Sequence, residues 1–191
     1  MAEKDAMRNH AVFLDRDGEV TEVKSKRVDY VNKPDDVYLL PGAAEAIAGL
    51  REAGFKIFIV TNQGGIGLGL MRHKNLTAVH EHLKELLAEK GAFVDDIAYC
   101  PHRPEGGCSC RKPKPGMILD LARRHGIALQ RSYMVGDMAT DIIAGQAAGT
   151  ITVLISSSES KKTGSNSTPA DLTADSLLEA AVKIIRKIGR G

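Results

Sequence analysis

The chain has 191 residues, of which 43% are hydrophobic, and this is enough for one substantial buried core. Its formal net charge of +2 and its 4% aromatic content argue against a nucleic-acid partner, which needs clustered positive charge and stacking side chains. Residues 1–10 are polar and no apolar run approaches the ~20 residues that cross a bilayer, so we expect a cytoplasmic protein with no signal peptide and no membrane partner.

The first predicted element is a buried strand over residues 11–14, which runs directly into Asp15, Arg16, Asp17 and Gly18. Open α/β sheets bind ligands at the carboxyl ends of their strands, so this strand delivers two carboxylates to such an edge. Aspartates at i and i+2 of a strand point the same way, and Gly18 permits an immediate turn. One carboxylate can attack phosphorus while the other moves a proton, with a divalent cation between them. An acidic turn without a ligand is the alternative.

Residues 41–54 have apolar side chains at helical spacing, and a second buried strand is predicted over residues 55–60. This strand leads into Thr61, Asn62 and Gln63, followed by glycines. Hydroxyl, amide and main-chain N–H groups of this kind can hold phosphate oxygens, so Thr61, Asn62 and Gln63 are candidate binding residues. A polar turn without a ligand is equally compatible with the pattern.

A further helix is predicted over residues 76–90, and it contains two histidines. His80 and His82 are two residues apart, so they point to different faces of this helix and do not form a metal site. We expect both of them on the surface, together with His73 and His125.

A third strand, predicted over residues 97–99, leads into residues 100–110, which hold all three cysteines of the chain and are called the metal loop below. Proline and glycines in this loop let the chain reverse, so its two arms can close around one ion. Three thiolates and one imidazole fill a tetrahedral Zn²⁺ shell and leave no position for water, which is typical of structural zinc. A disulfide or redox pair of cysteines is the alternative. The four expected ligands are Cys100, His102, Cys108 and Cys110.

Two basic residues, Arg111 and Lys112, lie between the metal loop and a helix predicted over residues 115–124. A cation fixed there can reach a phosphate held by the other strand ends, although a solvated basic turn would have the same sequence.

The next predicted strand, over residues 132–135, ends in Gly136 and Asp137. Asp137 can complete an oxygen shell for Mg²⁺. Asp141 can orient a water or a lysine, or it can be a helix N-terminal acid that interacts with the helix dipole.

Residues 156–168 lack apolar periodicity and are predicted to be a flexible loop, and an amphipathic helix is predicted over residues 174–188. Buried strands thus alternate with amphipathic helices. This alternation predicts a single α/β domain over residues 1–191, with a central parallel sheet between two helical layers.

The order of these motifs over residues 11–155 resembles the haloacid dehalogenase superfamily of aspartate-nucleophile phosphatases. The segments FLDRDG, TNQGGIG, CPH with CSCRKPKPGM, and MVGD are similar to a branch that has a zinc loop and contains heptose-bisphosphate and histidinol-phosphate phosphatases. The resemblance implies a three-layer Rossmann-like fold with a minimal cap.

The resemblance also implies roles for individual residues. Asp15 would be the nucleophile that forms an aspartyl phosphate, and Asp17 the general acid and base. Thr61 and Lys112 would stabilise the transferring phosphoryl group, and Arg111 would recognise the substrate. Mg²⁺ would bind a carboxylate oxygen of Asp15, the main-chain carbonyl of Asp17, and Asp137; the zinc ion would be structural.

The implied substrate is a small phosphorylated sugar or metabolite, and we expect a monomer. A heptose 1,7-bisphosphate is favoured, with histidinol phosphate or another sugar phosphate as the alternative. Two positions depart from the family pattern: Glu19 replaces a small or apolar residue, and Met138 replaces the lysine of heptose phosphatases. The basic segment 22–30 would shape the substrate entrance. A zinc-stabilised module that binds a phosphorylated ligand without turnover is the non-enzymatic alternative.

Overall fold

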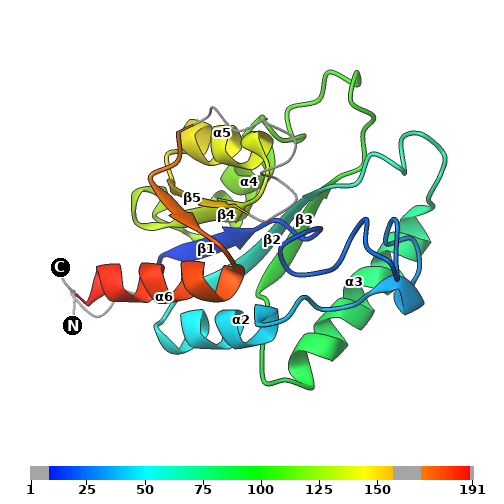
Figure 1. Cartoon of the computed structure of the whole chain (residues 1–191). Helices are drawn as coiled ribbons and strands as arrows, with labels where there is room; N and C mark the ends of the chain where they lie inside the picture. Colours follow the sequence, from blue (N-terminus) through cyan, green and yellow to red (C-terminus); the bar gives the residue numbers. More distant parts are fainter. Residues whose placement is uncertain (1–8, 157–168, 190–191) are drawn as a thin grey trace.

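A six-stranded parallel sheet forms the centre of the protein, with the strand order β3-β2-β1-β4-β5-β6 (Figure 1). The computed structural model describes residues 9–156 and 169–189. The strands are β1 (Ala11–Leu14), β2 (Lys56–Asn62), β3 (Asp96–Cys100), β4 (Tyr133–Gly136), β5 (Ile151–Ile155) and β6 (Leu172–Ala174). The helices are α2 (Ala43–Glu52), α3 (His73–Ala88), α4 (Gly116–His125), α5 (Ala139–Ala148) and α6 (Leu177–Ile188), with two short 3-10 helices, η1 (Pro34–Asp36) and η2 (Leu129–Arg131).

Helices cover both faces of the sheet, which confirms the predicted three-layer α/β class. Helices α2, α3 and α6 pack on one face and α4 and α5 on the other (Figure 1). Successive side chains of β1 and β2 point alternately toward the two helical layers, because side chains alternate between the faces of a strand. Leu14 and Ile57 belong to the first core, whereas Phe13 and Phe58 belong to the second.

Several predicted boundaries shift by a few residues. Strand β2 extends through Thr61 and Asn62, which therefore lie in the strand and not after it. The last helix begins only at Leu177, since residues 172–174 form β6 and the Ser176 side chain accepts a hydrogen bond from the main-chain N–H of Glu179 at 3.2 Å. Strands β5 and β6 had no counterpart among the predicted elements, and of helix α5 only its start near Asp141 was considered.

Of the loop predicted over residues 156–168, residues 157–168 lie outside the described part of the chain. No helix within residues 9–156 and 169–189 combines the length and the apolar character that a membrane crossing needs.

The predicted surface position of His80 is wrong. Its side chain is buried, whereas His82 on the same helix is partly exposed. His80 falls on the buried stripe of α3, four residues after Leu76 and three before Leu83, and this is the spacing of one helix face.

Helix α5 lies very close to the sheet at Gly145. A Cβ at this position would lie 2.7 Å from the Met134 Cβ and 2.9 Å from the Thr152 Cγ2. In helix α2, by contrast, a Cβ at Gly49 would meet only the Ile185 Cδ1, at an ordinary 3.8 Å.

These two helical glycines should therefore respond to alanine with opposite signs. We expect Gly145→Ala to lower the free energy of unfolding by about 1–3 kcal/mol, because the added methyl overpacks the contact with β4 and β5. Gly49→Ala should raise it by roughly 0.5–1 kcal/mol through helix propensity alone. Urea unfolding of both variants measures the difference, and equal effects would contradict the close packing of α5.

Candidate active site

The carboxyl ends of three adjacent strands bring together the polar residues of the sequence motifs. Asp15 follows β1, Thr61 lies near the end of β2, and Asp137 follows β4, and β1 is the middle strand of the three. Carboxylate oxygens of Asp15, Asp137 and Asp141 lie within 4.8 Å of one another. The sheet thus places an acidic cluster where open α/β folds bind ligands.

Lys112 is buried in this cluster and bridges two of its carboxylates. Its Nζ lies 3.0 Å from Asp15 Oδ1 and 2.6 Å from Asp141 Oδ1, and it donates to the main-chain carbonyl of Val60 at 2.9 Å. Asn62 fixes the main chain of Lys112: its Nδ2 donates to the Lys112 carbonyl at 3.1 Å, and its Oδ1 accepts from the Lys112 N–H at 3.0 Å. The Asn62 side chain thus positions the main chain of Lys112, and its predicted contact with phosphate stays a prediction.

Asp141 fills both of the roles that the sequence left open. Besides its contact with Lys112, its Oδ2 accepts a hydrogen bond from the main-chain N–H of Met138 at 3.1 Å and so caps the start of α5. Gly136 makes this close approach possible, since a Cβ there would overlap the Asp141 side chain. The Asp141 carboxylate therefore both orients Lys112 and caps the N-terminus of α5.

The cluster carries more negative than positive charge. Burial raises the pKa of Asp15 to about 7, with Lys112 acting against this and Asp141 adding to it. Burial and then Asp141 raise the pKa of Asp137 to about 6. Burial by itself would lower the pKa of Lys112, but Asp141 and Asp15 raise it above its usual value. An oxygen-only donor set with excess negative charge fits a hard divalent cation such as Mg²⁺.

Asp17 is held from three sides. Arg16 donates to both of its carboxylate oxygens, from Nε to Oδ1 and from Nη2 to Oδ2, each at 2.9 Å. Gln63 Nε2 donates to Asp17 Oδ2 at 2.9 Å and to Thr61 Oγ1 at 2.8 Å, and the Thr21 hydroxyl donates to Asp17 Oδ1 at 3.3 Å. Gln63, predicted to bind substrate, thus connects the two residues expected to act on the phosphoryl group.

Glu19 lies next to this cluster as a buried acid. Its side chain is 2% exposed, and its Oε1 has no hydrogen-bond partner among the described residues. Burial raises the pKa of Glu19 to about 9, with further contributions from the charges of Asp137, Asp15 and Asp141. Sequence inspection identified Glu19 only as a departure from the family pattern.

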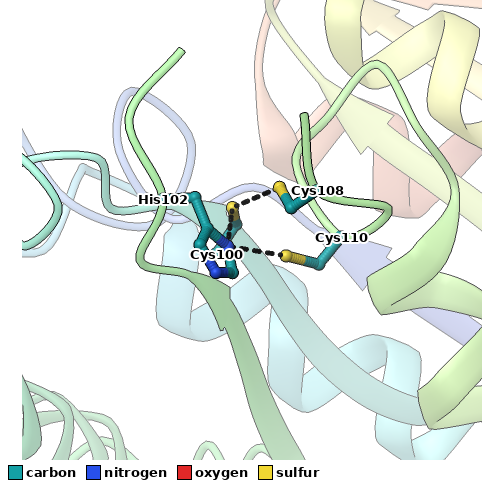
Figure 2. A group of neighbouring side chains, drawn as sticks. All are labelled: Cys100, His102, Cys108 and Cys110. Atoms are coloured by element: carbon teal, nitrogen blue, oxygen red, sulfur yellow. Dashed lines mark hydrogen bonds between the residues drawn. The ribbon is translucent and has the colours of Figure 1, made fainter. Parts of the chain in front are cut away.

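The metal loop brings its four expected ligands together (Figure 2). The Cys100 and Cys108 sulfurs are 3.6 Å apart, and His102 Nδ1 lies 3.6 Å from Cys100 Sγ and 3.3 Å from Cys110 Sγ. A tetrahedron with metal–sulfur bonds of about 2.3 Å would separate its sulfurs by roughly 3.8 Å. All three cysteines are free, so the disulfide alternative is not formed. The group has the dimensions of a tetrahedral metal site.

The thiols of the loop influence one another electrostatically. Burial, together with the Cys100 and Cys108 thiols, raises the pKa of the Cys110 thiol to about 12. A divalent cation at the centre would remove the mutual repulsion of the thiolates that causes part of this shift.

Two basic side chains that follow the metal loop donate hydrogen bonds back to its main chain. Arg111 Nη1 donates to the main-chain carbonyl of His102 at 3.3 Å, and Lys114 Nζ donates to that of Cys108 at 2.6 Å. The predicted reach of Arg111 to a substrate stays a prediction. In the basic segment 22–30, the Arg27 guanidinium pairs with Glu22 and lies 4.5 Å from the Tyr38 ring centroid.

Comparison with known proteins gives a consistent result. A family model described as haloacid dehalogenase-like hydrolase matches residues 1–149. A D-glycero-beta-D-manno-heptose-1,7-bisphosphate 7-phosphatase from Bordetella bronchiseptica is 40% identical over 152 residues, which are 80% of this chain and 83% of that protein. A protein of the same name from Pseudomonas putida is 37% identical over 175 residues, 91% of this chain and 98% of that one. The crystal structure of D,D-heptose 1,7-bisphosphate phosphatase from B. bronchiseptica complexed with magnesium and phosphate superimposes with a TM-score of 0.85 at 35% identity, covering 93% of this chain and 99% of the other.

The buried acid next to the cluster should make stability depend on pH in a defined direction. Because the pKa of Glu19 is about 9 in the folded state and about 4.5 when exposed, folding in magnesium-free buffer keeps a proton on Glu19. The free-energy cost of keeping this proton in the folded state grows as the pH rises from about 5 to 8, by up to about 1.4 kcal/mol per pH unit.

Glu19→Gln removes this cost, so its melting temperature should exceed that of the wild type by a margin that widens from pH 5 to pH 8. Glu89→Gln, at an exposed glutamate, is the control and should show no such trend. Thermal unfolding at several pH values measures both, and a constant margin would contradict a protonated Glu19.

Proposed function

The chain belongs to the haloacid dehalogenase-like hydrolases, and we propose that it is a magnesium-dependent phosphatase that removes the 7-phosphate of D-glycero-D-manno-heptose 1,7-bisphosphate. The observation that carries this proposal is the arrangement at the sheet edge. The Asp15 carboxylate faces the buried ammonium of Lys112 at 3.0 Å, with Asp137 in the same cluster.

The described side chains can perform both halves of such a hydrolysis. Asp15 attacks phosphorus and forms a phosphorus–oxygen bond as the bond to the sugar oxygen breaks, while Asp17 donates a proton to that oxygen. Asp17 then takes a proton from water, which attacks the aspartyl phosphate and releases phosphate and free Asp15. Lys112 and the Thr61 hydroxyl stabilise the phosphoryl oxygens.

The acidic cluster would hold the metal ion. A carboxylate oxygen of Asp15, the main-chain carbonyl of Asp17 and the Asp137 carboxylate would bind Mg²⁺, which neutralises charge on the phosphoryl oxygens. The relative from B. bronchiseptica, whose crystal contains magnesium and phosphate, supports this part of the proposal.

The metal loop would hold a structural Zn²⁺ ion. Its three thiols and one imidazole are the donor types that zinc prefers, and they leave no position for substrate or water. A fixed loop also fixes the chain that continues into Arg111 and Lys112, so zinc would act on catalysis by holding Lys112 in place.

Histidinol phosphate is the second candidate substrate. Met138, half exposed beside Asp137, takes the place of the lysine that the heptose branch is expected to have, and the metal loop has only five residues between His102 and Cys108. Other small sugar phosphates also remain open. The monomeric state and the cytoplasmic location stay predictions.

Replacement of the nucleophile tests the reaction. Asp15→Asn is close in shape but removes the attacking carboxylate, so we expect Mg²⁺-dependent phosphate release to fall by about a thousandfold or more. The assay compares both anomers of heptose 1,7-bisphosphate with histidinol phosphate, and Asp120→Asn on the exposed face of α4 serves as the control. Full activity of a folded Asp15→Asn protein would exclude the mechanism, and ligand binding without turnover by the wild type would favour the binding-module alternative.

The metal content of the purified protein tests the zinc assignment. We expect about one zinc per chain, and its loss in Cys108→Ser together with a decrease of more than about 2 kcal/mol in the free energy of unfolding. Ser109→Ala, an exposed neighbour in the same loop, should keep both the zinc and the stability. Elemental analysis and urea unfolding give the two readouts. A wild-type protein that is stable and active without zinc would overturn the assignment.

A further inference from the structure

Arg16, between the two aspartates after β1, is the largest fully buried side chain in the described part of the chain, with 1% of its surface exposed. Two of its nitrogens, Nε and Nη2, hold the Asp17 carboxylate as a fork, each at 2.9 Å. A buried guanidinium needs acceptors for its remaining N–H groups as well, because an unpaired buried donor is destabilising. The position of Asp17 therefore depends on what holds the other side of Arg16.

His80 supplies this further acceptor. Its Nε2 lies 3.3 Å from Arg16 Nη1, and its side chain is 6% exposed. Burial and then the positive charge of Arg16 lower the pKa of His80 to about 3, so the ring is neutral and can accept the hydrogen bond. The Tyr99 ring stands at an angle of 62° to the His80 ring at a centroid distance of 5.7 Å and limits its movement.

We propose that His80 is a positioning residue: by accepting a hydrogen bond from Arg16 it fixes the guanidinium fork that holds Asp17 beside the nucleophile. Within the described residues, Arg16 Nη1 has no other hydrogen-bond partner. Loss of this acceptor frees the guanidinium to rotate toward other acceptors, and its two bonds to Asp17 are lost with that rotation. In the part of the chain that the structure describes, His80 makes no hydrogen bond to Asp15, so it acts through Arg16.

The inference rests on the proposed function, in which Asp17 donates a proton to the leaving group and later takes one from water. A small displacement of a proton-transferring group costs rate more than binding. His80 should therefore affect kcat and leave KM nearly unchanged, which distinguishes it from a residue of the substrate entrance.

Three variants on helix α3 test this role. His80→Leu keeps an apolar volume without an acceptor, and His80→Gln restores an amide oxygen as the acceptor. His82→Leu is the control at a partly exposed histidine of the same helix. With wild-type substrate, we expect kcat of His80→Leu to fall about 10- to 100-fold while KM stays nearly constant. His80→Gln should recover most of this loss, and His82→Leu should match the wild type. Thermal unfolding verifies that each variant is folded.

A second substrate separates the two proton transfers. With p-nitrophenyl phosphate the leaving group departs without a proton, so phosphorylation of Asp15 should stay fast in His80→Leu while hydrolysis of the aspartyl phosphate slows. A burst of p-nitrophenolate followed by slow turnover is the expected signature.

Other outcomes would overturn the inference. Wild-type kcat in folded His80→Leu would show that Arg16 does not need the acceptor, and equal losses in His80→Leu and His80→Gln would show that His80 acts through packing. If the wild type itself releases no phosphate, the proposed function fails, and crystal structures of His80→Leu decide the inference separately. A fork still paired with Asp17 would refute it, and a displaced fork would support it.

Discussion

The site depends on the buried ammonium of Lys112 between the carboxylates of Asp15 and Asp141. A buried charge is strongly destabilising unless it is paired and hydrogen-bonded, and Lys112 supplies the opposite charge to both carboxylates while they supply it to Lys112. The three residues come from the end of β1, from the chain after the metal loop and from the first turn of α5. One electrostatic contact therefore holds together segments that are distant in sequence.

Around this contact, a second set of side chains holds Lys112 and Asp17 in place. Asn62 fixes the main chain of Lys112, Arg16 and Gln63 hold Asp17, and His80 holds Arg16. Groups that are oriented before substrate binds need little reorganisation during the reaction, which lowers the barrier. The metal loop contributes to the same positioning, because the chain continues from this loop directly into Arg111 and Lys112.

The contacts that sequence analysis did not foresee have a common physical cause: each depends on a residue distant in sequence. Asn62 was expected to bind phosphate, which stays a prediction, and only the approach of the chain at Lys112 shows that its amide also bonds there. His80 carried a usable signal, since it lies on the apolar stripe of its helix at the spacing of Leu76 and Leu83. Its partner Arg16 gave no such signal, because an arginine between two aspartates at a strand end can equally well be solvent-exposed or buried.

The sequence by itself determined the three-layer class, the polar residues that follow the predicted strands, and the four expected ligands of the metal loop. These features follow from local periodicity and from spacing within a few residues. Neither depends on how the rest of the chain is arranged in space. Only the tertiary structure decided which polar groups meet. Lys112 pairs with Asp15 and Asp141, Arg16 turns inward to His80, and the buried Glu19 has no partner for its Oε1 among the described residues. Such pairings depend on strand order and on the paths of connecting segments, and no short stretch of sequence encodes either.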